Sequence, residues 1–125
     1  MVHFPTMKAR VLRVWTPPGY RKPSAHEPKY PVLYLNDGQN LFEDQLCFSG
    51  VSWKAGLTAA ALINSGSIPP FLIVGIDHSE GNRSYDYCPY APGTGVSDFR
   101  PEAKSWPGGG VDAYLKGVVE EVNFL

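Results

Sequence analysis

This sequence of 125 residues lacks several features that would identify a membrane, secreted, nucleic-acid-binding or metal-binding protein. No run of about 18 apolar residues exists to form a membrane span, and Met1–Arg10 has no apolar segment of a secretory signal. The net charge of −1 gives no reason to expect nucleic acid or a membrane as partner. The two cysteines, Cys47 and Cys88, lack metal-site spacing, so we expect free thiols in a reducing, cytoplasmic compartment.

Glycine and proline, in contrast, are abundant, with 13 and 12 residues. They predict long ordered loops between few elements, within one domain of ordinary size. The first of these elements is Lys8–Trp15, which is rich in β-formers and ends at a Pro-Pro-Gly stop. A polar link that contains several prolines, Arg21–Lys29, follows it.

Two further segments, Tyr30–Leu35 and Phe71–Ile76, are apolar almost throughout, as in parallel strands covered on both faces. Between them, Trp53–Asn64 has apolar residues at helical spacing, with Ser52 as the expected N-cap and Gly66 just past the end. The order predicts a βαβ unit with parallel neighbouring strands and the helix on one sheet face. The residues expected to supply much of the core are Val32, Leu33, Leu35, Ile73 and Val74.

The last third of the chain contains one aperiodic segment and one periodic one. Asp77–Gly110 shows no periodicity and carries aromatic and charged residues, which predicts a long functional loop. From Val111 to Val122, apolar residues recur at helical spacing and predict an amphipathic helix.

Several segments together resemble a known family. They are RVWTPPGY, YPVLYLNDGQNLF, a tryptophan that opens a helix, IPPFLIVGID, Arg83 followed by Tyr87 and Pro89, and Gly-Gly before VDAYLKGVVEEV. In this order they resemble the α/β-hydrolase esterases of the esterase D-like, enterochelin esterase-like and feruloyl esterase-like kind. The resemblance implies an α/β fold, the N-terminal portion (1–125) of a three-layer α/β-hydrolase sandwich. It also implies a serine carboxylic-ester hydrolase that acts on a small-molecule ester and needs no cofactor.

A serine esterase of this class needs a nucleophile on a G-x-S-x-G elbow, a histidine base and an orienting carboxylate. Two serines match half of the elbow, Ser52 in GVSWK and Ser97 in GVSDF, and both lack the closing glycine. We interpret Ser52 as a helix cap and Ser97 as a loop residue. The family's catalytic residues would lie beyond Leu125, so we expect no catalytic residue here and an inactive fragment.

Two further hypotheses are alternatives to an esterase fragment. A non-catalytic binding or regulatory module that retains the esterase pocket remains open. A metal- or thiol-dependent enzyme that uses Asp77, His78 and one cysteine is disfavoured, because the cysteines and histidines form no ligand pattern, and we predict no metal site.

The loop after the Tyr30–Leu35 strand, Asn36–Asn40, is where the resemblance implies an oxyanion hole. The backbone N–H of Gln39, with Asn40 beside it, is the expected donor. Asp37 is expected to line the pocket and to bond loop amides. The other interpretation is that this is only a favourable turn sequence, because Asn, Asp and Gly all favour turns.

Four further residues are expected to line the same pocket. Asp77 and His78 follow a predicted parallel strand at its carboxyl end, where open α/β sheets bind ligands. Arg83 is expected in a buried ion pair flanked by phenols such as Tyr87. The alternative for Arg83 is a salt bridge that only tethers the loop.

Overall fold

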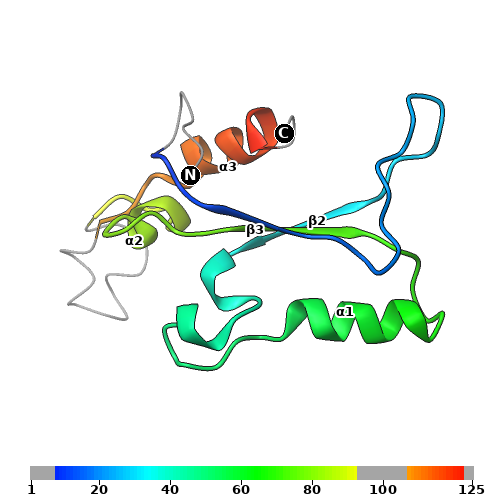
Figure 1. Ribbon diagram of the computed structural model, residues 1–125. Helices are drawn as coiled ribbons and strands as arrows, with labels where there is room; N and C mark the ends of the chain where they lie inside the picture. The colour runs from blue at the N-terminus through cyan, green and yellow to red at the C-terminus, as the bar shows by residue number, and fades with distance from the viewer. Residues whose placement is uncertain (1–7, 93–106, 123–125) are drawn as a thin grey trace. The chain divides into compact units, whose positions relative to one another are not determined.

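Figure 1 shows the computed structural model of the protein, which describes residues 8–92 and 107–122. The protein is a small mixed α/β structure, and its chain divides into two compact units. One unit is Val11–Asp77, and the other is made from residues before and after it. None of the helices in the described ranges is long and apolar enough to cross a membrane. Ser97 lies outside the described residues.

The Val11–Asp77 unit is built on a three-stranded sheet in the order β1-β3-β2. β2 (Val32–Asn36) runs parallel to β3 (Leu72–Ile76). Their register runs from Val32 beside Leu72 to Asn36 beside Ile76. This confirms the predicted parallel pair. β1 (Leu12–Trp15) pairs antiparallel with β3, which makes β3 the central strand.

Helix α1 (Ala55–Asn64) connects the two parallel strands and ends as the sequence predicts. Gly66 has a φ of 75°, and its N–H donates to the Ile63 carbonyl at 3.0 Å. The Ser67 N–H donates to the Leu62 carbonyl at 3.0 Å. These two bonds form a Schellman motif, which needs a left-handed residue at the position of Gly66.

The beginning of α1 differs from the prediction. The helix starts at Ala55 rather than Trp53, and its N-cap is Lys54, with φ of 54° and no side-chain cap bond. The Ser52 N–H instead donates to the Asp44 carboxylate at 2.8 Å, and the Trp53 N–H donates to the Asn40 carbonyl at 2.8 Å. The left-handed Lys54 breaks the helical conformation before Ala55, so Ser52 and Trp53 remain in the preceding loop.

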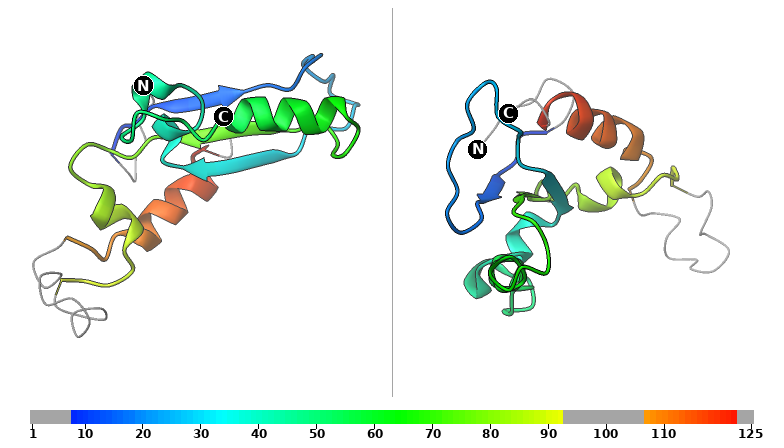
Figure 2. Two further views of the ribbon diagram at one scale, coloured as in Figure 1. Left: turned by 90° about the horizontal axis from the view of Figure 1, so that it is seen from below. Right: turned by 90° about the vertical axis from the view of Figure 1, so that its right-hand side faces the viewer.

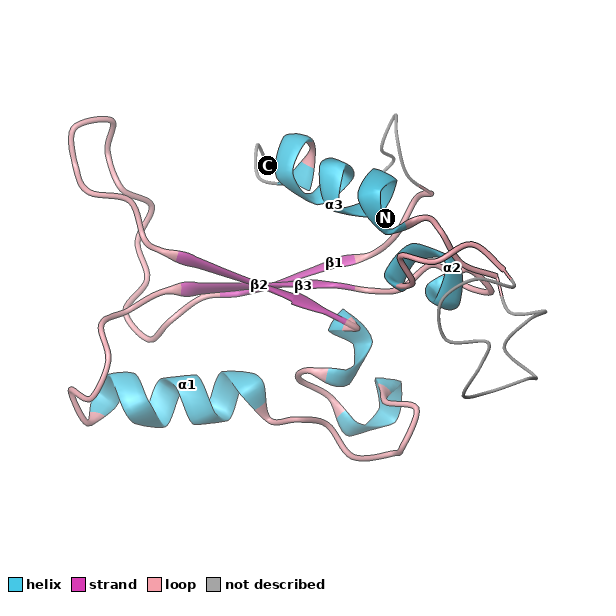
Figure 3. Ribbon diagram, turned by 180° about the vertical axis from the view of Figure 1, so that it is seen from behind, coloured by secondary structure: helices cyan, strands magenta, loops and turns pink. Residues whose placement is uncertain are grey.

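The core of this unit lies between the sheet and α1, which runs along one sheet face (Figures 2 and 3). Ile73 is 2% exposed, as expected, but Val32 and Leu33 are 39% and 44% exposed. The expectation that β2 is covered was wrong because β2 is an edge strand, and no other described strand pairs with its outer side. The core and the residues packed against it are Leu41, Ala59, Ile73, Trp15, Leu35, Phe42, Ala55 and Phe71.

The second unit contains two helices, α2 (Arg83–Tyr87) and α3 (Val111–Glu120). α3 confirms the predicted amphipathic helix, although only part of its apolar stripe is buried: Tyr114 is 2% exposed and Val119 64%. α2 lies within the segment that was expected to be an irregular loop. It has five residues, too few for its sequence to show a helical period.

The difference in exposure between the central strand β3 and the edge strand β2 predicts different costs for two truncations. Ile73→Ala should lower the free energy of unfolding by about 2–5 kcal/mol, because it leaves a cavity in the core. Leu33→Ala should cost less than about 1.5 kcal/mol, because its side chain is already half exposed. Urea denaturation followed by circular dichroism measures both, and a larger loss for Leu33→Ala would contradict the structure.

Candidate functional site

The candidate site begins where β2 ends and the chain turns sharply. Asp37 adopts a left-handed conformation, with φ of 53° and ψ of 48°, and the 3-10 turn η1 (Gly38–Asn40) follows. The Asn40 N–H donates to the Asp37 carbonyl at 2.9 Å, and the Leu41 N–H donates to the Gly38 carbonyl at 3.2 Å. Aspartate tolerates this conformation better than most residues, so the sequence Asn-Asp-Gly favours the turn.

Two glycines let the η1 turn approach β3 closely. A Cβ on Gly38 would lie 2.7 Å from the Gly75 carbonyl carbon and 2.7 Å from Asp77 Oδ1. A Cβ on Gly75 would lie 3.0 Å from the Gly38 Cα. Only glycine fits at both positions, so the turn rests on the backbone of β3.

The backbone donor of Gln39 is left unused in this turn. The first N–H groups of a helical turn have no partner within it, and among the described residues the Gln39 N–H finds no acceptor elsewhere. The Gln39 carbonyl, in contrast, lies 3.6 Å from the Cys47 thiol. The Asn40 N–H is used inside the turn, so of the two residues expected at the oxyanion hole only Gln39 presents a backbone N–H without an acceptor.

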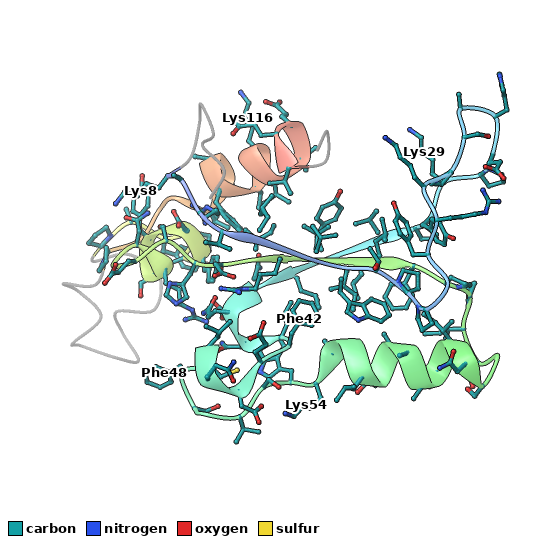
Figure 4. All side chains as sticks on the ribbon, viewed as in Figure 1. Lys8, Lys29, Phe42, Phe48, Lys54 and Lys116 are labelled. Atoms are coloured by element: carbon teal, nitrogen blue, oxygen red, sulfur yellow. The ribbon has the colours of Figure 1, made fainter. Side chains whose placement is uncertain are left out.

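The segment after η1 folds back onto it through Asp44, at the start of the 3-10 turn η2 (Asp44–Leu46). Asp44 Oδ1 accepts from the Ser52 N–H at 2.8 Å and from Lys54 Nζ at 2.6 Å. The bond from Lys54, followed by that from Ser52, lowers the pKa of Asp44 to about 2. Phe48, near the tip of this segment, is fully exposed (Figure 4).

Asp77, at the carboxyl end of β3, is held by Arg13, a partner that the sequence did not indicate. Arg13 on β1 donates from Nε to Oδ1 and from Nη2 to Oδ2, each at 2.8 Å. The hydrogen bonds to Asp77 raise the pKa of Arg13, against the opposing effect of its burial. Both carboxylate oxygens are engaged, so Asp77 braces this end of the sheet. An arginine inside the apolar segment VLRVW is the signal that could have indicated such a partner.

The other unit holds the remaining predicted pocket residues, His78, Arg83 and Tyr87. His78 Nδ1 lies 3.4 Å from the Ser79 carbonyl oxygen. The Arg83 guanidinium carbon lies 5.2 Å from the centre of the Tyr87 ring, and Tyr87 meets Tyr114 edge-on at 5.3 Å. Asp37, Gln39, Asn40 and Asp77 belong to the Val11–Asp77 unit.

The expected buried ion pair exists in this second unit, but its cation is Arg10 rather than Arg83. Arg10 Nη2 lies 3.3 Å from Asp86 Oδ2, and the Arg10 side chain is fully buried. Asp86 also accepts from Ser79 Oγ at 3.2 Å and from Asn82 Nδ2 at 2.8 Å. The sequence did not indicate Arg10, because 76 residues separate it from Asp86.

The ring of Tyr114 on α3 completes this cluster. The Arg10 guanidinium carbon lies 5.1 Å from its centre. Burial raises the pKa of the Tyr114 phenol, so the ring stays neutral beside the ion pair. The two cysteines are free thiols in different units. Within residues 8–92 and 107–122, no group of three or more potential metal ligands occurs.

Removing one member of the buried pair should destabilise the protein strongly. We expect Arg10→Met to lower the free energy of unfolding by about 3–5 kcal/mol, because it leaves the Asp86 carboxylate buried without its cation. Adding Asp86→Leu should recover part of the loss. The exposed Arg83 is the control, and Arg83→Met should cost less than about 1 kcal/mol. Equal losses in urea denaturation would contradict the assignment of Arg10.

The Asp44 carboxylate predicts a pH dependence. Its pKa should be about 2 in the folded protein instead of 3.8, and Lys54→Met should move it upward. Because the folded pKa is the lower one, the stability this group contributes is present above 3.8 and is lost as the pH falls towards 2. NMR titration of the carboxyl carbon measures the midpoint. Lys116→Met is the control and should leave the Asp44 midpoint unchanged. An Asp44 midpoint that does not move in Lys54→Met would refute the pairing of Asp44 with Lys54.

Comparison with known proteins gives a likeness of fold. No family model matches the sequence, and no curated protein matches it. Among solved structures, the crystal structure of BES protein from Bacillus cereus is similar, with a TM-score of 0.57 and 21% sequence identity. The match covers 89% of this chain and 40% of that chain, so the present chain spans less than half of the solved one.

Proposed function

We propose that this chain supplies the oxyanion-hole side of a serine carboxylic-ester hydrolase with the three-layer α/β-hydrolase architecture. The observation that carries the proposal is the Gln39 N–H, which finds no acceptor among the described residues at the carboxyl end of β2. In α/β-hydrolases one oxyanion donor comes from a loop between a strand and the helix that follows it. The η1 turn lies in such a loop, between β2 and α1.

In the proposed reaction, a serine attacks the carbonyl carbon of a small-molecule ester, and negative charge develops on the carbonyl oxygen. The Gln39 N–H stabilises that oxygen together with the N–H of the residue after the nucleophile. The proposal places the serine, histidine and orienting acid outside these 125 residues. Asp77 takes no part as the acid, because Arg13 occupies both of its oxygens.

The surroundings of Gln39 support the proposal because such a donor must be fixed before the reaction. Gly38 packs against the backbone of Gly75, so the turn cannot move closer to β3 without a steric clash. The Trp53 and Ala55 N–H groups bond the carbonyls of Asn40 and Leu41 at 2.8 and 3.0 Å. The turn is therefore held on both sides, and the Gln39 N–H has a defined position.

Removal of this donor tests the proposal in a hydrolase that contains this chain together with the proposed serine, histidine and acid. Gln39→Pro deletes the N–H without deleting any hydrogen bond of the turn, and proline is tolerated in the first turn of a helix. We expect kcat to fall by about 10²–10³-fold, the cost of one lost oxyanion donor. Gln39→Ala keeps the N–H and should retain kcat within about threefold. Unchanged turnover in the proline variant, with thermal stability preserved, would reject the assignment.

The second test uses residues 1–125 alone. We expect no hydrolysis of a chromogenic short-chain acyl ester and no labelling by a fluorophosphonate probe, because no serine here lies on a G-x-S-x-G elbow. Ser52 has a buried hydroxyl with no hydrogen-bond partner among the described residues, which leaves it without a base. Covalent labelling of Ser52 or Ser97, with turnover abolished by the matching alanine variant, would overturn the expectation.

A further inference from the structure

The loop between β1 and β2 is held in shape by its own side chains. Arg21 donates to both carboxylate oxygens of Glu27, from Nη1 at 2.8 Å and from Nη2 at 2.5 Å. The Ser24 N–H adds a third bond to the Glu27 carboxylate at 2.8 Å. Chiefly the bond from Arg21, and then that from Ser24, lower the pKa of Glu27 to about 2. The Glu27 charge is therefore already matched within the loop.

A groove of about 450 Å³ opens between this loop and the first residues of β2 and β3. Its walls are mainly apolar. Tyr20 and Tyr30 pack with ring centres 5.3 Å apart and an angle of 48° between their planes. Val32 and Leu72, which pair with each other in the sheet, contribute the apolar wall on the strand side. The groove lies at the end of β2 opposite to η1.

The charge of the groove has one sign. Lys22 and Lys29 line it, and no carboxylate does (Figure 4 shows Lys29 on the loop). Among the described residues, neither lysine forms an ion pair. The nearby carboxylate of Glu27 is occupied by Arg21 and leaves both ammonium groups unmatched. An apolar wall with two free cations is complementary to a molecule that carries both an apolar part and negative charge.

We propose that this groove binds a small organic anion in which an apolar ring or chain is joined to a carboxylate. Pockets of small-molecule ligands have volumes of about 300–1,000 Å³ and mainly apolar walls with a few polar groups, and the groove matches this description. The aromatic pair and Val32 contact the apolar part of the ligand, and the lysines contact its carboxylate. Because the internal bonds of Glu27 fix the loop, little ordering is needed on binding.

The first experiment compares two probes that share one ring system, 2-naphthoate and the uncharged 2-naphthalenemethanol. Each is titrated into ¹⁵N-labelled protein and followed by NMR. We expect 2-naphthoate to shift the amide signals of residues 20–32 and Leu72 saturably, and the alcohol to bind at least about tenfold more weakly. Equal affinity for both probes, absence of shifts, or shifts elsewhere in the chain would overturn the proposal.

The second experiment tests the lysines. The double variant Lys22→Gln/Lys29→Gln should bind 2-naphthoate about three- to tenfold more weakly and bind the alcohol unchanged, because each exposed ion pair contributes little by itself. Lys116→Gln, an exposed lysine on α3, is the matched control and should leave both affinities unchanged. Equal weakening in the control, or none in the double variant, would overturn the proposal. Saturable binding of an acidic peptide without binding of 2-naphthoate would also overturn it, in favour of a protein partner.

Discussion

The approach of Gly38 to Gly75 is the contact on which the geometry of the candidate site depends. It lets the turn after β2 rest directly on the backbone of β3, where a side chain at either glycine would meet backbone atoms at 3.0 Å or less. The left-handed Asp37 and the short η1 turn follow from this, because the chain must reverse within a few residues to stay on β3. A turn of this kind uses the Asn40 and Leu41 N–H groups internally and leaves the Gln39 N–H without an acceptor among the described residues.

Charged groups brace the regions around this contact. Arg13 ties β1 to Asp77 at the carboxyl end of β3, and Asp44 ties the segment after η1 to Lys54 at the start of α1. The Arg13–Asp77 pair is partly buried and bidentate, so its geometry is well defined. The Asp44–Lys54 pair is exposed and contributes mainly by closing the loop. These pairs hold structure, and none of them needs a catalytic role.

The sequence was sufficient where local pattern decides the structure. The parallel pair of β2 and β3 follows from two apolar segments on either side of a helix, and the end of α1 follows from Gly66. The sequence was insufficient where contacts between residues that are distant in the chain determine the structure. Ser52 was expected to cap α1, but the Asp44 carboxylate, eight residues earlier, binds its N–H instead. The exposure of Val32 depends on the order of the strands, which periodicity does not contain.

The features of the candidate site also fall into those that the local sequence predicts and those that depend on distant partners. The turn at Asp37–Asn40 was predictable from residue preferences, and the position of Asp77 from the carboxyl end of its strand. The partners of the two acids Asp77 and Asp86 were not predictable from the sequence. Arg13 lies 64 residues from Asp77, and Arg10 lies 76 residues from Asp86. Arg83 was expected in a buried ion pair flanked by phenols, but its side chain is exposed and its guanidinium lies over the Tyr87 ring.

Amide hydrogen exchange across the η1 turn, followed by NMR on the 125-residue chain, tests the unused donor directly. The Gln39 N–H should exchange close to its unprotected rate, whereas the Asn40 and Leu41 N–H groups, bonded to the Asp37 and Gly38 carbonyls, should be protected. Protection of the Gln39 N–H equal to that of Asn40 would mean that it already has an acceptor. It would then not be available to an oxyanion, and the proposed role of this turn would be wrong.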